Sequence, residues 1–313
     1  MYKHITRLST ADMSHDQWLE ERRKAIGGSD ASSIIGLNPW SSPFTVWADK
    51  LGKLPPKEDT ESMRLGRDLE DYVAKRFTEK TRKKVRRERA ILYNSDFPFA
   101  HANVDRMVVG EDAGLECKTT SIMNLKKFKN GSYPDNYYVQ CVHYLMVTGC
   151  QRWYLGVLVL GDGFYDFVIE RDEEEIAALA KSEEEFWEYV KSKTPPETDG
   201  KNSTSESIGL LFPKSNDEIV GLTAYNRDLA EYIALSAQIK ALEGRKEDVA
   251  NRVKAFMKEA GKGESERYRV SWTSAERNNF DAKRFAADHR DIDLSEYYKK
   301  STYRTFKVTE IGG

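Results

Sequence analysis

The stretch that decides the fold is HANVDRMVVGEDAGLECKTT, residues 101–120. Apolar and polar residues alternate on both sides of the turn GEDAG, a pattern that predicts two strands joined as a hairpin. Alternate residues of a strand share a face, so we expect Glu116 and Lys118 to point the same way. If the two strands pair as their alternation suggests, Asp105 comes near Glu116.

These three charged residues form the pattern Asp-x10-Glu-x-Lys, which suits the binding of a metal ion. Two carboxylates held close together repel each other, and a divalent cation between them relieves that repulsion. Oxygen ligands favour Mg²⁺ or Mn²⁺ over zinc. Lys118 is placed to hold an attacking water or to balance charge developing on a phosphate. The alternative is an ordinary half-exposed strand whose charged side chains are solvated.

Two flanking segments add polar residues to this pattern. Apolar residues spaced by three and four predict a helix over 61–81, and Glu70 lies among them, where an unpaired carboxylate is costly to bury. The alternative for Glu70 is an exposed acid at the rim of that helix. A second amphipathic helix is predicted over 134–148, and Gln140 shares one of its sides with two tyrosines.

An anion-binding loop is expected near the N-terminus at IGGSD, residues 26–30. Its two glycines expose backbone N–H groups at the start of a predicted helix, for which Ser29 or Asp30 is the expected N-cap. Helix N-termini attract anions, and Arg22 would add a bidentate partner. Arg23 is the next residue along the chain, so either Arg22 or Arg23 could be the arginine that binds the anion.

The composition excludes several classes of protein. With 32% charged residues and no run of about 18 uncharged apolar residues, the 313-residue chain does not read as a membrane protein. Its N-terminus lacks the apolar segment of a secretory signal, so we expect a cytoplasmic protein. Three cysteines at irregular spacing fit neither a disulfide framework nor a zinc site.

Charge alone does not indicate a nucleic-acid-binding protein, because the formal net charge is −2. One run, KTRKKVRRER at residues 80–89, has seven cations and one acid. Such a run suits a phosphate backbone, whose attraction to Lys and Arg is largely independent of sequence. The alternative is a solvated turn between a helix and a strand.

The chain divides into three zones. Residues 1–193 mix helices with strands, and the strands are predicted at 85–93, 100–109, 114–119, 152–160 and 164–170. Residues 194–207 lack large apolar side chains and are interpreted as a linker. Residues 208–313 are an extension in which a helix is predicted over about 220–257, followed by short strands. The apolar stripe of that helix must be buried, and there are three alternatives for how: the helix packs on the core, it folds into a hairpin near Gly244, or it associates with other copies of the chain.

Several blocks occur in the order and spacing of a known family: ERRKAIGGSDASSIIGLNPWSSPFTVWADKLG, MRLGRDLEDYVAKRF, VDRMV, LECKTT, YYVQCVHYLMVTG and FVIERDEEEI. Over residues 15–193 the chain resembles the YqaJ-type viral recombinases, phage and prophage relatives of lambda exonuclease within the PD-(D/E)XK nuclease superfamily. The resemblance implies an α/β (α+β) fold. Its restriction-endonuclease-like core would have a mixed central sheet flanked by helices, with a C-terminal helical extension carrying short strands.

The resemblance also implies an activity. Proteins of this family are magnesium-dependent exonucleases that digest one strand of double-stranded DNA from its 5′ end and leave a 3′ overhang for a single-strand annealing protein. Two Mg²⁺ ions are expected, with Mn²⁺ as a substitute. The expected partners are double-stranded DNA ends, a phage-type annealing protein and further copies of the chain in a trimeric ring, all in the cytoplasm of a bacterial host. The alternatives are a non-catalytic DNA-binding or annealing module and an endonuclease or nickase on the same fold.

The family's site residues carry over by position. The metal-holding positions are matched by Asp105, Glu116, Glu70 and the backbone carbonyl of Cys117. Lys118 resembles the catalytic lysine, and Gln140 the glutamine on the helix behind the site, which serves catalysis and DNA binding. Arg22 and Ser29 resemble the arginine and serine that hold the terminal 5′-phosphate, with Arg23 as the other candidate.

Overall fold

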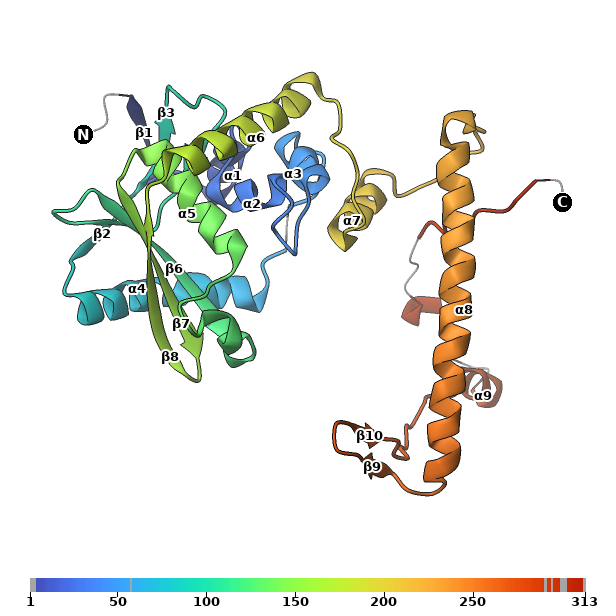
Figure 1. The fold of residues 1–313 in the computed structure, drawn as a ribbon. Coiled ribbons are helices and arrows are strands. Elements are labelled where there is room, and N and C mark those ends of the chain that lie inside the picture. The colour runs from blue at the N-terminus through green and yellow to red at the C-terminus, as the bar shows by residue number, and fades with distance from the viewer. Residues whose placement is uncertain (1–3, 57, 290–291, 294, 299–302, 312–313) are drawn as a thin grey trace. The chain divides into compact units, whose positions relative to one another are not determined.

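The computed structural model describes residues 4–56, 58–289, 292–293, 295–298 and 303–311. Its contacts divide the chain into two compact units, Met1–Phe212 and Pro213–Gly313. In the first unit, helices lie on both sides of a twisted sheet, and the second unit contains one long helix (Figure 1). The mixed α/β fold class expected from the sequence is therefore found in the first unit.

A five-stranded mixed sheet forms the centre of the first unit, in the order β2-β5-β6-β7-β8. Its strands are β2 (Val85–Arg87), β5 (Arg106–Val108), β6 (Ala113–Ser121), β7 (Arg152–Leu160) and β8 (Gly163–Glu170). Among its pairs only β6 and β7 run parallel. A parallel pair needs a crossover connection. Here that connection includes the 3-10 segment Ile122–Phe128 and helix α5 (Asp135–Thr148).

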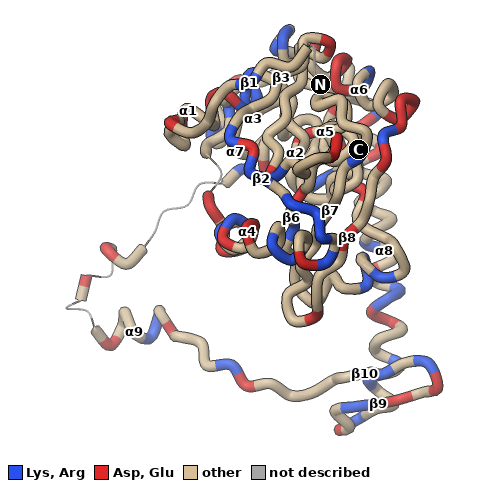
Figure 2. Tube along the Cα trace, turned by 90° about the vertical axis from the view of Figure 1, so that its left-hand side faces the viewer, with Lys and Arg blue, Asp and Glu red and all other residues tan. Residues whose placement is uncertain are grey.

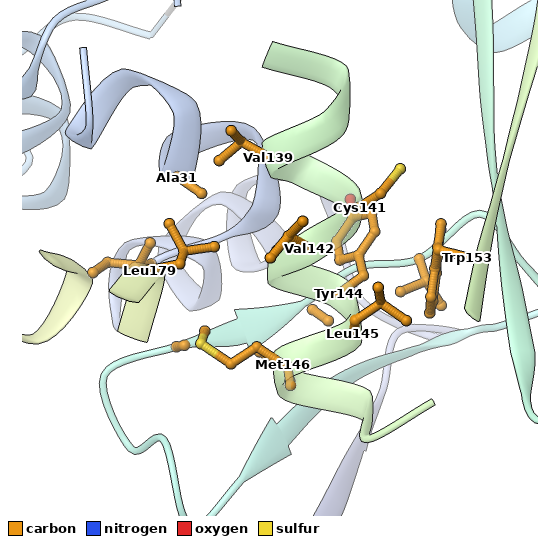
Figure 3. Packing of buried hydrophobic residues seen from close by; sticks show 14 of the residues in the cluster. Ala31, Val139, Cys141, Val142, Tyr144, Leu145, Met146, Trp153 and Leu179 are labelled. Atoms are coloured by element: carbon orange, nitrogen blue, oxygen red, sulfur yellow. The ribbon is translucent and has the colours of Figure 1, made fainter. Parts of the chain in front are cut away.

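The two faces of the sheet are covered by different helices. Helix α4 (Glu61–Thr81) packs through Phe77 in a cluster that includes Leu115 of β6. Helix α5 packs on the opposite face, where its buried side chains meet Trp153 (Figure 3). Because alternate residues of β6 face opposite ways, Leu115 lies toward α4 while Glu116 lies toward α5.

A smaller sheet pairs β1 (Ile5–Ser9), β3 (Ala90–Asn94) and β4 (His101–Ala102) in the order β1-β3-β4. The strands predicted as continuous over 85–93 and 100–109 are therefore each divided between two sheets. The breaks fall at residues 88–89 and 103–105, where the backbone leaves one sheet and enters the other. The second break ends with Asp105, the residue directly before β5.

Further helices pack around this core: the short helices α1 (His15–Arg23), α2 (Gly28–Ile34), α3 (Pro43–Lys50) and α7 (Asn202–Leu211), and the longer α6 (Glu173–Ser192). Ala31 of α2 lies beside Val139 of α5 in the buried core (Figure 3). The N-cap of α2 is Gly27, whereas the sequence favoured Ser29 or Asp30. Asp30 caps from inside the helix instead, because its Oδ2 accepts a hydrogen bond from the Gly27 N–H at 2.9 Å.

Part of the expected linker is helical and packed. Helix α7 lies against α3, with Thr204 Oγ1 donating to Ser42 Oγ at 2.7 Å and the Thr45 and Ser207 hydroxyls 3.0 Å apart. Within residues 194–207 the contact is made by serine and threonine hydroxyls, which is why composition favoured a linker, and Leu211, beyond that range, packs on the core. The division between the units falls after Phe212.

The second unit is built around α8 (Asn226–Met257), a continuous helix of 32 residues. It passes through Gly244 without a break, so the hairpin alternative is wrong. After it come a small antiparallel hairpin, β9 (Lys262–Glu264) with β10 (Arg269–Ser271), and α9 (Ala282–Asp288). Short 3-10 turns occupy Thr223–Tyr225 and Ser295–Tyr297. In the described part of the chain, no helix has the length and apolarity needed to cross a membrane.

Candidate active site

Asp105 and Glu116 are brought together by the pairing of β5 with β6. The antiparallel register matches Arg106 with Leu115, which places Asp105 across from Glu116. The Oδ2 atom of Asp105 accepts a hydrogen bond from the backbone N–H of Cys117 at 2.7 Å. The hairpin predicted from the sequence is confirmed, and it holds the first carboxylate against the strand that carries the second.

Glu116, Lys118 and Gln140 form a closed set of polar contacts. The Lys118 Nζ lies 2.6 Å from Glu116 Oε1 and donates to Gln140 Oε1 at 2.9 Å. The Gln140 Nε2 donates to Glu116 Oε1 at 2.8 Å and to the Tyr144 hydroxyl at 2.8 Å. The Tyr137 ring lies 5.2 Å from the Lys118 Nζ. Strand β6 and helix α5 thus position one another's polar side chains.

The electrostatics of this cluster favour an added cation. Burial, followed by the charges of Glu116 and Glu70, raises the pKa of Asp105 well above its usual value. Burial, the largest single effect, would lower the pKa of Lys118, but the charge and hydrogen bond of Glu116 together with the charge of Asp105 raise that pKa overall, so the ammonium stays charged at neutral pH. Glu116 is only 3% exposed, and among the described residues its Oε2 has no hydrogen-bond partner. A buried carboxylate oxygen without a partner is costly and suits a metal ligand.

Glu70 is held by a partner of its own, although its charge, after burial and the charge of Glu116, helps to raise the pKa of Asp105. It projects from α4 and forms an ion pair with Arg106, which is 3% exposed. The same guanidinium donates to the backbone carbonyl of Asp105 at 2.7 Å and to Asp71 at 2.6 Å. Across the described residues, no three His, Cys, Asp or Glu side chains are grouped so as to hold a metal ion. Glu70 is thus connected to Asp105 through Arg106 rather than placed beside it.

The expected anion-binding residues lie together at the ends of α1 and α2. The Arg22 Nη2 donates to the Ser29 Oγ at 2.9 Å, and the Arg22 guanidinium lies 4.8 Å from the centre of the Trp18 ring. Arg23 turns elsewhere, with its guanidinium 3.8 Å from the carboxylate of Asp49. Of the two candidate arginines, Arg22 is the one that meets Ser29.

Gly28 connects the two groups of residues. A Cβ atom at this position would lie 2.6 Å from Tyr144 Cε1 and 3.2 Å from Gln140 Cγ. The first turn of α2 therefore presses directly on the part of α5 that holds Lys118 and Glu116. Ser29, the next residue along the chain, therefore follows directly after the point where α2 meets Gln140 and Tyr144.

The basic run at residues 80–89 is neutralised in large part. Lys and Arg gather around β2 (Figure 2), but four of its cations form ion pairs with acids: Lys80 with Asp166, Lys83 with Glu111, Arg86 with Glu88, and Arg87 with Asp71. Residues 82–84 form the turn between helix α4 and strand β2, and the rest of the run belongs to those two elements and to the segment after β2.

Two buried cations near the site were missed by the sequence interpretation. Arg106 and Lys50 each contact a predicted site residue or its backbone. Neither lies in a spacing pattern used to predict site residues. Their burial depends on packing of α4 and α3 that no local spacing shows.

The chain is similar in sequence to one protein family and in fold to a solved exonuclease structure. Residues 17–151 match the family described as the YqaJ-like viral recombinase domain. The uncharacterized protein YqaJ of Bacillus subtilis (strain 168) is 41% identical over 307 residues, which covers 96% of each chain. LHK-Exo, an alkaline exonuclease from Laribacter hongkongensis, is 18% identical in its crystal structure with dAMP, with a TM-score of 0.50 over 57% of this chain and 93% of that chain. This likeness supports the fold.

Proposed function

Because this chain belongs to the YqaJ-like viral recombinase family, we propose that it is a metal-dependent exonuclease acting on linear double-stranded DNA. It digests one strand in the 5′-to-3′ direction and leaves a 3′ overhang for recombination by single-strand annealing. The observation that carries the proposal is the contact of Gly28 with Gln140 and Tyr144, which sets an anion-binding pair beside a crowded carboxylate cluster.

The residues present fit a hard divalent cation. Asp105 and Glu116 would hold Mg²⁺, or Mn²⁺ in its place, because both carboxylates are crowded and Glu116 Oε2 lacks a partner among the described residues. The carbonyl of Cys117 and, once released by Arg106, the carboxylate of Glu70 would complete sites for two ions. When bound, the metal supplies activation of a water and stabilisation of the leaving 3′-oxygen.

The chain's own groups position the reacting phosphate. The ammonium of Lys118, held by Glu116 and Gln140, stays protonated and offers positive charge to a phosphate oxygen. Gln140 fixes the orientation of Lys118 and Glu116 through its hydrogen bonds to both side chains. These contacts exist before substrate arrives, so little reorganisation is needed during the reaction.

The direction of digestion is set by the Arg22–Ser29 pair. Arg22 and Ser29 bind the terminal 5′-phosphate through charge-assisted and hydroxyl hydrogen bonds. Since Gly28 fixes this pair against α5, a phosphate bound there places the next bonds of the strand at the carboxylate cluster. The crystal structure of LHK-Exo with dAMP, a nucleoside monophosphate, is consistent with a site of this kind in the same fold.

The proposal is tested with three DNA substrates, each with and without Mg²⁺: linear duplex labelled at the 5′ end, linear duplex labelled at the 3′ end, and closed circular duplex. A 5′-to-3′ exonuclease releases the 5′ label first and leaves the circle intact. Cleavage of the circle would favour an endonuclease or nickase, and binding without digestion a non-catalytic module.

Two partners belong to the same proposal. The apolar stripe of α8 follows alternate spacings of three and four, as in helices that associate side by side, with one interruption at Lys246. It comprises Tyr232, Leu235, Ile239, Leu242, Val249, Val253 and Phe256, each between 40% and 88% exposed. We assign it to association with further copies of the chain, in a trimeric ring by resemblance.

A phage-type annealing protein would receive the 3′ overhang in the bacterial cytoplasm.

A further inference from the structure

A buried ion pair lies directly behind the Arg22–Ser29 pair. Lys50, the last residue of α3, has a side chain that is 2% exposed, and its Nζ lies 2.7 Å from Asp30 Oδ2. The same Nζ donates to the backbone carbonyl of Arg22 at 2.8 Å. A buried ammonium is costly unless it is paired and hydrogen-bonded, and here both conditions are met by residues next to the proposed phosphate site.

The ion pair holds two elements at once. On one side, Lys50 contacts the carbonyl of Arg22, which lies in the last turn of α1, where helix carbonyls lack partners within the helix. On the other side, Asp30 accepts the N–H of Gly27, the N-cap of α2. The end of α1 that carries Arg22 and the start of α2 that carries Ser29 are thereby joined through one pair of charges.

His101 adds a second donor to the same carbonyl. Its Nε2 lies 3.2 Å from the oxygen of Arg22, while the side-chain amide of Asn103 lies 3.2 Å from its Nδ1. Burial, together with the charge of Lys50, lowers the pKa of His101 to about 3, so the ring is neutral and donates one N–H. Two donors from different elements, Lys50 and His101, therefore fix the backbone of Arg22.

We propose that Lys50, paired with Asp30, is a positioning residue that gives the protein its preference for 5′-phosphorylated DNA ends. This inference rests on the proposed 5′-phosphate site. Lys50 is too buried to touch DNA, and it acts by keeping the Arg22 guanidinium and the Ser29 hydroxyl at the spacing that a phosphate needs. Small displacements of binding groups cost large factors in rate, so loss of the pair should appear as loss of discrimination.

The test uses the double variant Asp30→Asn/Lys50→Met, because removing Lys50 alone would leave an unpaired buried carboxylate. Lys53→Met is the matched control, since its ammonium lies over the Trp47 ring, 4.4 Å from the centre, at the same end of α3. The ratio of kcat/KM for 5′-phosphorylated and 5′-hydroxyl ends is measured on otherwise identical duplexes. Affinity for the same duplexes is measured in EDTA by fluorescence anisotropy, which reports the pocket without chemistry.

Wild type and Lys53→Met should prefer phosphorylated ends by roughly tenfold or more, as a charge-assisted contact allows. In the double variant, the rate ratio and the affinity ratio should both fall toward one. A purely structural ion pair would lower the melting temperature and leave both ratios unchanged. If the folded double variant keeps the wild-type ratios, the inference is overturned.

Failure of the proposed function gives a different result. If wild type shows no preference, or if Arg22→Ala keeps it, the phosphate site itself is wrongly assigned, and Arg23→Ala is tested next. If circular dichroism shows that the double variant does not fold, Asp30→Asn alone replaces it, since its amide oxygen still accepts the Gly27 N–H and the Lys50 ammonium keeps its hydrogen bond to the Arg22 carbonyl. That variant should lower both ratios at least twofold, and unchanged ratios would again overturn the inference.

Discussion

Gly28 and Tyr144 are in such close contact that a Cβ atom on Gly28 would lie 2.6 Å from the Cε1 of the tyrosine ring. Both partners are constrained, because Gly28 begins α2 and Tyr144 is buried in the middle of α5. This contact fixes the distance between the Arg22–Ser29 pair and the carboxylate cluster. A change at Gly28 should therefore affect stability and catalysis together.

Gly28→Ala should destabilise the protein by about 1–3 kcal/mol, the usual cost of overpacking a buried contact. It should also reduce cleavage, because Gln140 must move to make room and would then hold Lys118 poorly. Denaturant unfolding and the cleavage rate measure the two effects. Gly209→Ala, at a helical glycine where an added Cβ would have no described atom within 4 Å, is the control and should be neutral or stabilising. Equal behaviour of the two variants would contradict the packing argument.

Asp105→Asn should abolish cleavage and yet keep or raise the melting temperature in EDTA. Burial and the nearby charges of Glu116 and Glu70 disfavour the ionised carboxylate, so its replacement by a neutral amide relieves repulsion. Asp96→Asn, at an exposed carboxylate, is the control for the change of residue type. Retained Mg²⁺-dependent digestion in Asp105→Asn would show that the metal is held elsewhere.

His101 should make the stability depend on pH. Its pKa is lowered by burial to about 3 in the folded protein, against an ordinary value of 6.5. Between these values the unfolded chain binds the additional proton, so stability falls as the pH falls from about 6.5 toward 3, by at most about 1.4 kcal/mol per pH unit. His101→Gln should lose less stability over this range. Denaturant unfolding at pH 7.5, 6.0 and 5.0 measures the difference, and parallel curves for the two proteins would contradict it.

Much of the first unit could be predicted from local pattern. The helix over 61–81 and the strand that carries both Glu116 and Lys118 follow from spacing, and the structure confirms them. The division of residues 85–109 between two sheets could not be predicted, because alternation along a strand does not record a change of partner strand. Burial of Arg106 and Lys50 depends on helices that approach from far along the sequence. The contacts that fix Glu70 and Arg22 could therefore not be predicted from the sequence either.

The apolar stripe of α8 should hold copies of the chain together. Aspartate at Leu235, Ile239 and Val253 should convert the assembly to monomers in light scattering, because charges are costly in a buried helical seam. Digestion of long duplexes should then become distributive. These residues lie along a helix that has no buried residue within the described chain.

The control for this variant carries aspartate on the opposite face of α8, at Ala230, Ala237 and Asn251. It has the same added charge and should keep the wild-type mass. A wild-type protein that is monomeric at micromolar concentration, with and without DNA, would refute the assignment of the stripe to an oligomer.

The central claim is that the Asp105–Glu116–Lys118 cluster cuts the strand whose 5′ end lies at Arg22 and Ser29. Its most direct test is a time course of digestion of a duplex with a different fluorophore in each terminal region of one strand, for wild type and Glu116→Gln. Wild type with Mg²⁺ should release nucleotides from the 5′ region first and leave the complementary strand as a 3′ overhang, while Glu116→Gln binds the duplex and releases none. Release from the 3′ region first, or wild-type digestion by Glu116→Gln, would contradict the account.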